Sequence, residues 1–391
     1  MRKVLVSVAL AAASVLAAPK PVPAPKSITT PSATIPAPKS APVIITPYGM
    51  VQYRLRYETV DTIPETGKTI SSNTYSNTIG YKVGVKAQVN KEVFLQLEVG
   101  NDWNGTETVN DLANNYFKKR DPYTPWFSLA YAQWDPGYLH IQAGIVPVKG
   151  TATYDLFGAS ILNDRKYASA AHVPWGTITN SGMPGLRMGT PVLKGEFKLG
   201  FDFMTTVLNQ RSMKAAYYSE IKSNHSAIGY MFDFPMSVED LTLTPQLIII
   251  SDRNYNSQTG EGDPEILGGI DVGYKLSKQA TFRLGAGLAS NGNKNSKPDS
   301  VYERIGSNGN IGTTIICGPG KLDLDYYLST DENTKINNSR NYYQLIDVKY
   351  GWVANKYFTI TPRLRYFINT NEANKKWNNA IRPELIFAGS F

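Results

Sequence analysis

The sequence has 391 residues, 42% of them hydrophobic. Beyond its N-terminus it contains no apolar stretch near the roughly 20 residues that a membrane-spanning helix needs. Three histidines and the single Cys317 argue against a histidine-based metal centre, a catalytic dyad and a disulfide framework, so we expect no metal or other cofactor. A net charge of +8 is a mild excess, whereas a nucleic-acid-binding protein would concentrate its basic residues, so we expect no nucleic-acid partner.

The first segment has the pattern of a secretory signal peptide. Arg2 and Lys3 precede an apolar stretch that is followed by small residues. We predict a signal peptide over residues 1–17, with cleavage after Ala17, because Pro19 would crowd a cut after Ala18. The alternative is a short membrane anchor, which the shortness of the apolar stretch disfavours.

The next segment, residues 18–46, is rich in Pro, Ala and Lys and contains no aromatic residue until the strands begin. Such a composition favours an extended, polyproline-like chain over a packed domain. We interpret it as a spacer. The alternative is that its lysines contact an anionic partner such as the cell wall.

The remainder of the chain, 47–391, alternates between apolar and polar residues. In its first segment, 49–59, Val51 and Tyr53 lie on one face while Arg54 and Arg56 lie on the other. A period of two predicts β-strand and not helix. About sixteen segments have this pattern: 49–59, 78–89, 92–100, 126–134, 138–148, 186–193, 196–208, 226–234, 241–251, 265–276, 280–290, 310–318, 321–330, 342–353, 357–368 and 380–391.

The connections between these segments alternate between short turns and long polar loops. The face opposite the apolar one carries charged residues in nearly every segment, and aromatic residues gather near the segment ends. Apolar-out, polar-in strands with aromatic girdles are typical of a transmembrane barrel. In lipid every backbone amide must be paired, so such a sheet must close. We predict an all-β, antiparallel transmembrane β-barrel of about sixteen strands, with fourteen to eighteen consistent with the pattern.

The whole of 47–391 resembles the sixteen-stranded general porins of the Gram-negative outer membrane. The resemblance rests on the signal peptide, the hairpin rhythm, the length and the final Phe391. It implies a barrel that is integral to the outer membrane and surrounded by its lipids, with residues 18–46 in the periplasm. It also implies a water-filled channel for passive diffusion of small hydrophilic solutes and ions, a homotrimer and no enzymatic activity.

The longest loop, 149–185, follows the fifth predicted strand. The resemblance implies that it folds into the lumen and narrows it, and its many apolar residues suit packing inside a barrel. The alternative is a loop folded over the outer mouth. Its charged candidates for the constriction are Asp155, Asp164, Arg165 and Lys166.

Basic residues occupy the polar faces of the first two predicted strands. These candidates for the pore-lining wall are Arg54, Arg56, Lys82 and Lys86. In the resembling family such a wall faces acidic residues of the constriction loop, here Asp155 and Asp164, which would create a transverse field. The other predicted wall charges are of both signs, among them Arg363, Arg365 and Glu384, which argues against a dedicated anion channel.

Three other functions are alternatives for such a barrel. A barrel lipase needs a Ser–His pair at the lipid-facing rim, and no GxSxG pattern lies near the histidines. A porin specific for a sugar, phosphate or peptide is an alternative, because four aromatic residues are predicted to face inward: Tyr327, Tyr343, Tyr357 and Phe367. A structural barrel tethered to peptidoglycan through residues 18–46 is the third.

The last predicted strand ends on an aromatic residue. In "ELIFAGSF", Leu385, Phe387, Gly389 and Phe391 share one face. We expect this face to contact lipid and the strand to pair with the first one, since an open edge is not tolerated in lipid. By resemblance, the alternating end with Phe391 is the signal read by the barrel assembly machinery.

Overall fold

The computed structural model describes ten ranges of the chain, which all belong to one compact unit, Ala41–Phe391. The described ranges are 42–63, 68–100, 126–147, 183–193, 196–208, 227–250, 265–290, 304–333, 340–371 and 378–391. The predicted signal peptide, 1–17, and most of the predicted linker lie outside them. Within these ranges no helix is long and apolar enough to span a membrane.

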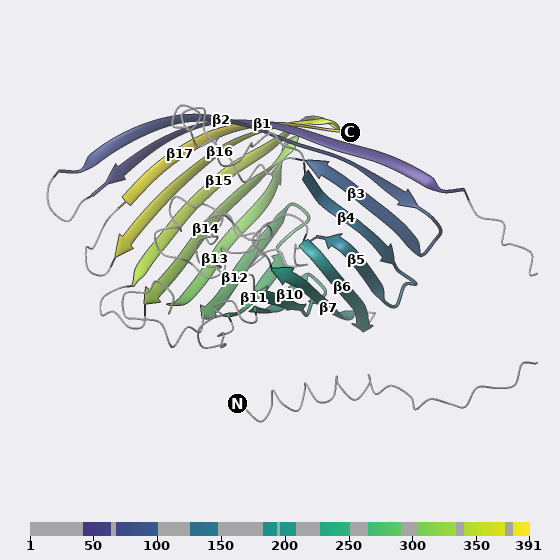
Figure 1. Ribbon diagram of the computed structural model, residues 1–391. Coiled ribbons are helices and arrows are strands. Elements are labelled where there is room, and N and C mark those ends of the chain that lie inside the picture. Colours follow the sequence, from purple (N-terminus) through teal and green to yellow (C-terminus); the bar gives the residue numbers. More distant parts are fainter. Residues whose placement is uncertain are drawn as a thin grey trace, which may run out of the picture. The chain divides into compact units, whose positions relative to one another are not determined.

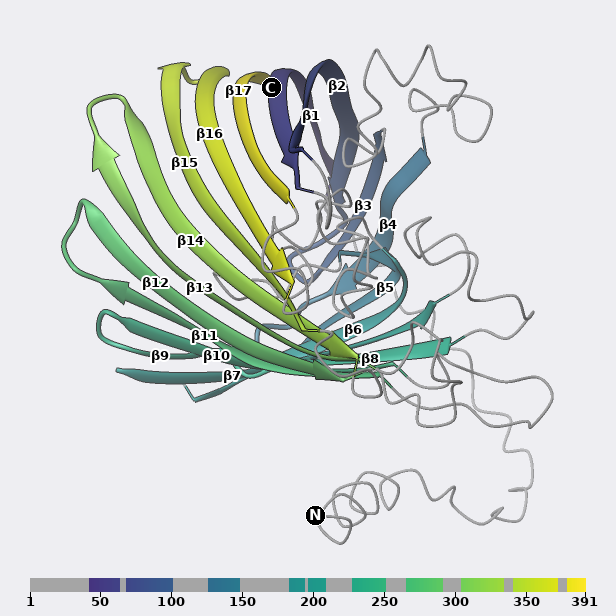
Figure 2. The same ribbon diagram turned by 90° about the vertical axis from the view of Figure 1, so that its left-hand side faces the viewer.

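The described part of the chain is built from seventeen antiparallel strand segments (Figures 1 and 2). They are β1 (Ile44–Thr62), β2 (Ile70–Gln88), β3 (Val93–Gly100), β4 (Trp126–Trp134), β5 (His140–Val146), β6 (Met183–Leu193), β7 (Phe197–Leu208), β8 (Ala227–Asp233), β9 (Met236–Val238), β10 (Leu241–Ile250), β11 (Glu265–Lys275), β12 (Ala280–Ser290), β13 (Arg304–Cys317), β14 (Gly320–Asn333), β15 (Asn341–Asn355), β16 (Phe358–Asn371) and β17 (Asn378–Ser390).

The sheet closes on itself as a barrel. β1 pairs with β2 along its whole length and with β17 on its other edge, which joins the two ends of the described chain. β8 and β9 both pair with β7 and β10, so they are two parts of one wall strand, and the wall has sixteen strands in the described residues. This confirms the predicted closed antiparallel barrel and its strand number.

Each predicted segment coincides with one wall strand, but the strand lengths differ. β1 begins at Ile44, before the predicted barrel boundary at Pro47, because Ile44 and Ile45 pair with Gln88 and Ala87 of β2. β2 begins at Ile70, well before the predicted start at Thr78. This first part of β2 is mostly polar, and its two large apolar residues, Ile70 and Tyr75, fall on opposite faces, so it carries no apolar alternation from which a strand could be predicted.

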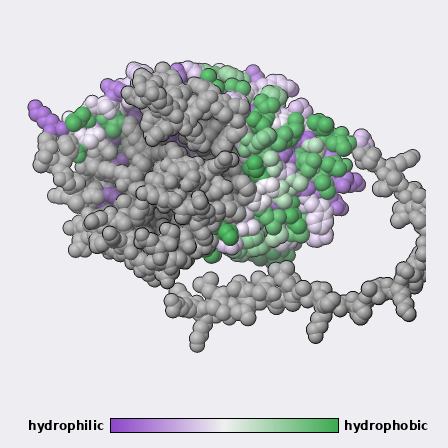
Figure 3. Space-filling model, viewed as in Figure 1, coloured by the Kyte–Doolittle hydropathy of each residue, from purple (hydrophilic) through white to green (hydrophobic). Residues whose placement is uncertain are grey.

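The barrel is inverted relative to a water-soluble β protein. On β1, Val51 and Leu55 are exposed on the outer face while Glu58 is buried on the inner face. The same holds on β3, where Leu95 is exposed and Glu98 is buried. In Figure 3 hydrophobic residues spread over the described outer surface. Because exposed apolar bands of this kind suit contact with lipid, the burial pattern is that of a transmembrane barrel.

Exposed aromatic residues lie where the strands meet the short turns. Trp134 and Tyr138 flank the β4–β5 turn, and Trp352 and Phe358 lie near the β15–β16 turn. Aromatic rings are amphipathic and settle at the membrane–water interface. This end of the barrel therefore carries the predicted aromatic girdle.

The seam between β1 and β17 ends in an aromatic contact with a glycine. The backbone N–H of Gly49 donates to the carbonyl of Phe391 at 3.2 Å, and the N–H of Phe391 donates back to Gly49 at 3.1 Å. The ring of Phe391 lies where a β-carbon on Gly49 would be, so the missing side chain makes room for it. Phe391 is 68% exposed on the outer side, as predicted for a lipid-facing residue.

The register of the seam can be tested by cross-linking. Tyr53 lies directly opposite Phe387 across the seam. Directly opposed residues have Cα atoms about 4.5–5.5 Å apart, within the range of a disulfide, whereas diagonal neighbours are about 7–8 Å apart. In a Cys317→Ser background, we expect the pair Tyr53→Cys with Phe387→Cys to oxidise readily. The pair Tyr53→Cys with Gly389→Cys is the control, and equal oxidation of both pairs would contradict the seam.

Candidate functional site: a charged cluster on the lumen wall

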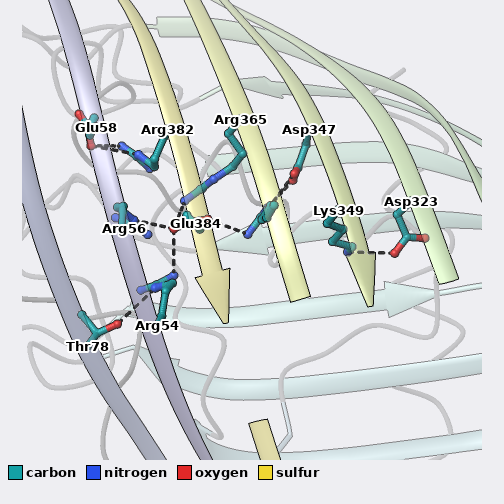
Figure 4. A network of polar contacts seen from close by, with 11 residues as sticks. Arg54, Arg56, Glu58, Thr78, Asp323, Asp347, Lys349, Arg365, Arg382 and Glu384 are labelled. Carbon is teal, nitrogen blue, oxygen red and sulfur yellow. Dashed lines mark hydrogen bonds and ion pairs between the residues drawn. The ribbon is translucent and has the colours of Figure 1, made fainter. Parts of the chain in front are cut away.

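Charged side chains gather on the inner face of neighbouring strands at the seam (Figure 4). Five adjacent strands supply most of them: β1, β17, β16, β15 and β14. Because alternate residues of a strand share a face, each strand contributes charges two residues apart, such as Arg54 and Arg56 on β1. The strand register then aligns them across the wall, with Arg56 opposite Glu384 and Glu384 opposite Arg363.

Glu384 of β17 is the centre of this cluster. Its carboxylate accepts a hydrogen bond from Nε of Arg56 at 2.5 Å, and Nη2 of Arg365 lies 2.8 Å from the same oxygen. Nη1 of Arg54 and Nη1 of Arg363 lie farther away, at 3.8 and 3.7 Å. The Glu384 side chain is 0% exposed. A buried carboxylate must be compensated by opposite charge and hydrogen bonds; four guanidiniums provide the charge, and Arg56 donates a hydrogen bond.

Arg363 connects this centre to the carboxylates of β15. Its guanidinium donates two hydrogen bonds to Asp347, one of them 2.8 Å from Nε to Oδ1. This two-point geometry fixes the orientation of the guanidinium plane. Its remaining amino group is thereby directed toward Glu384.

The row continues along the wall through alternating charges. Nζ of Lys349 lies 3.4 Å from Asp323 on β14. Arg283 of β12 reaches Asp325 at 2.6 Å and Asp323 at 3.6 Å. Gly312 stands between β12 and β14 at this level, and a β-carbon there would meet the carboxylate of Asp325. The absence of a side chain on β13 therefore allows Arg283 to reach across it.

Arg382 of β17 is held more deeply than the arginines around Glu384. Arg382 donates from Nε to Glu58 at 3.0 Å, and its guanidinium lies 4.8 Å from the ring centre of Phe367. Arg365 lies over the same ring at 5.6 Å. The Arg382 side chain is 1% exposed. Stacking and ion pairing together make it part of the wall rather than of the channel surface.

A separate polar network lines β1 to β4. The hydroxyl of Tyr48 donates to Glu98 at 3.2 Å and accepts from Gln96 at 2.6 Å. Glu98 also accepts from Ser128 at 2.5 Å and pairs with Lys82 at 3.0 Å. With three side-chain partners, Tyr48, Ser128 and Lys82, Glu98 is satisfied within the wall.

Farther round the barrel, Arg187 of β6 and Asp202 of β7 form a two-point ion pair. Both of its hydrogen bonds are 2.8 Å long. Nε2 of His140 lies 3.3 Å from the same carboxylate, with its ring over Gly189. His140 thus points to the lumen and not to a lipid-facing rim, where a barrel lipase would need it.

All four residues predicted for the basic wall lie on the inner face, but they do not act as one group. Arg54 and Arg56 converge on Glu384, whereas Lys82 pairs with Glu98 of β3. Lys86 lies over the Tyr48 ring, 5.8 Å from its centre. Their partners within the described ranges are wall carboxylates, the hydroxyl of Thr78 and the ring of Tyr48. The predicted constriction residues Asp155, Asp164, Arg165 and Lys166 lie outside the described residues.

Sequence reasoning placed Glu384, Arg363 and Arg365 on the lumen wall but did not bring them together. It missed Arg382 altogether. Arg382 has the same parity as Glu384, so the alternation of β17 could have identified it as lumen-facing. The convergence itself depends on the pairing of β17 with both β1 and β16, which the period of two does not reveal. In the described ranges no three His, Cys, Asp or Glu side chains group closely enough to hold a metal ion.

The barrel is similar to solved outer-membrane channels, although no protein-family model and no curated protein matches the sequence. The outer membrane channel DcaP of Acinetobacter baumannii has a TM-score of 0.56 at 10% identity, covering 89% of this chain and 97% of that one. The anion-selective porin from Comamonas acidovorans has a TM-score of 0.56 at 13% identity, with coverages of 90% and 100%. Salmonella typhi OmpF, in complex with daunomycin, has a TM-score of 0.52 at 13% identity, with coverages of 89% and 97%.

These likenesses define the fold of this chain. It is the sixteen-stranded antiparallel barrel of the outer-membrane porins, as the sequence predicted. At identities of 10–13% the likeness extends to the fold alone, so function must be argued from this chain's own residues.

The role of Glu384 can be tested by neutralising it. Removing one partner of a buried ion pair costs about 3–5 kcal/mol, because the remaining charges are left uncompensated. Glu384→Gln leaves Arg54, Arg56 and Arg365 facing one another, so we expect a clearly lower urea midpoint in tryptophan-fluorescence unfolding. The matched control is Glu332→Gln, which removes an exposed pair with Arg340 and should change the midpoint little. Similar midpoints for the two variants would contradict the central place of Glu384.

Proposed function

We propose that this protein is an outer-membrane channel of the porin type, through which small hydrophilic solutes and ions diffuse passively. The observation that carries the proposal is the inverted burial of the barrel. Charged residues line its inner wall while apolar ones cover its outside. An apolar exterior is costly in water and favourable in lipid, and a charged inner wall favours a hydrated lumen.

The proposal includes the route by which the protein reaches the membrane. Residues 1–17 would act as a cleaved signal peptide, and residues 18–46 would remain in the periplasm as a spacer. The alternating end of β17 with Phe391 would be read by the barrel assembly machinery. A homotrimer and contact of residues 18–46 with peptidoglycan are further expectations from the resemblance to porins.

A constriction by the long segment after β5 is part of the same proposal. Residues 149–185 would enter the lumen and bring Asp155 and Asp164 toward the basic wall, with Arg165 and Lys166 beside them. The support comes from the composition of this segment, whose apolar residues suit a packed position. An ordered segment in the lumen would set the size cutoff of the channel.

Neither an enzyme nor a sugar channel gains support from the described residues. His140 points inward beside Arg187 and Asp202, away from lipid substrates. Of the aromatic residues that suggested a sugar path, Tyr343 and Phe367 are buried at 2% and 0% exposure, and Tyr357 lies in an exposed turn. Tyr327 is half-buried. With two of the four rings covered and a third in a turn, the four do not form a continuous aromatic surface along which a sugar could slide.

Single-channel recording in planar bilayers tests the channel and its constriction together. We expect purified protein to give ohmic conductance steps, and a variant that lacks residues 155–166 to give larger ones, because a narrower lumen passes less current. No steps from folded protein would contradict the channel. Equal steps from both proteins would contradict the constriction while leaving the channel in place.

A further inference from the structure

More guanidiniums than carboxylates converge at Glu384. Four guanidiniums lie within 3.8 Å of its carboxylate. One of them, that of Arg363, is also compensated by Asp347. The ion pairs of Arg54 and Arg56 both go to the single carboxylate of Glu384, which Arg365 also approaches. Although the inner wall as a whole carries both signs, this part of it is locally cationic.

Arg54 is the arginine of this group with the weakest ionic contact. Its closest carboxylate atom, Oε1 of Glu384, is 3.8 Å away, and that oxygen is approached more closely by Arg56 and Arg365. Its Nε donates to the hydroxyl of Thr78 at 3.2 Å, which is a neutral acceptor. A hydrogen bond to a hydroxyl holds the side chain in place but does not balance its charge.

Three arginines of this group are accessible to solutes. The side chains of Arg54, Arg56 and Arg363 are 16%, 15% and 15% exposed, against 5% for Arg365, which is packed over Phe367. Arg363 is already held by two hydrogen bonds to Asp347, so an anion in the lumen can best reach the guanidiniums of Arg54 and Arg56, whereas Arg365 serves mainly to hold Glu384. This difference separates the arginines that could bind a ligand from those that support them.

On the neighbouring strand β2, two hydroxyl side chains lie opposite the arginines of β1. Thr78 of β2 is paired with Arg54, and Ser76 is paired with Arg56. Thr78 accepts a hydrogen bond from Arg54, so its own O–H can donate to another group. Guanidinium forks with hydroxyl donors match the oxygen atoms of carboxylates and phosphates.

We propose that Arg54, Arg56 and Thr78 form an anion-binding site that takes the carboxylate or phosphate group of a passing solute. The site makes the channel prefer anions to cations, because a locally positive wall raises the concentration of anions beside it. This inference rests on the proposed channel function and adds its solute class. The mixed signs of the wall charges led us to expect no dedicated anion channel. The proposed site changes that expectation, because the positive charges are concentrated around Arg54 and Arg56.

The preference is measured as a reversal potential in a KCl gradient across a planar bilayer. We expect wild-type channels to favour chloride, and Arg54→Gln to move the permeability ratio of chloride to potassium toward one. The matched control is Lys356→Gln, which removes a positive charge from the short β15–β16 turn and should leave the ratio unchanged. Arg54→Lys keeps the charge and should keep the preference.

Binding is measured by adding inorganic phosphate or succinate to the same channels. Either ion should lower the wild-type current, and the one that does so at lower concentration identifies phosphate or carboxylate as the better ligand. Arg54→Lys should lose most of this block, because an ammonium cannot make the two-point contact of a guanidinium. Block that persists in Arg54→Lys and Arg54→Gln would overturn the site, as would potassium-selective wild-type channels. The absence of any conductance steps would instead contradict the channel itself.

Discussion

The paired ladder between β1 and β17 is the constraint on which the rest of the structure depends. It closes the sheet, so that every wall strand has a neighbour on each side and no backbone edge is left for lipid to cover. Closure also decides which side of every strand is inside. It brings Arg54 and Arg56, near the start of the chain, against Glu384 near its end. The charged cluster is therefore a product of the seam.

Most of the barrel could be predicted from the sequence, because each strand is identified by the alternation of its own neighbouring residues. A period of two identifies a strand and separates its two faces, so Val51 and Arg54 were assigned to opposite sides correctly. The split strand β8–β9 was not anticipated, and it falls beside Pro235, which has no N–H to donate to a neighbour. Prolines similarly interrupt the ladder on one side at Pro362 and Pro383.

The site was less predictable because its contacts depend on register between strands far apart in the chain. Single-strand patterns placed Arg54 and Glu384 on inner faces, but only the alignment of β1, β17 and β16 puts four guanidiniums around one carboxylate. The expected partners of the basic wall were residues of the long loop. In the described residues these partners are instead wall carboxylates, Glu384 and Glu98. A carboxylate at the centre of the arginines fixes their positions, and this arrangement gives the channel wall its local positive charge.

The central claim is that one face of each strand meets water in the lumen and the other meets lipid. Thiol labelling along β1 tests it most directly, with Val51→Cys, Gln52→Cys, Leu55→Cys and Arg56→Cys made singly in a Cys317→Ser background and reconstituted in lipid vesicles. The account predicts that a membrane-impermeant reagent modifies the cysteines at 52 and 56, while those at 51 and 55 are protected and a lipid-borne quencher reaches a probe placed there. Uniform labelling, or labelling with the opposite parity, would contradict it.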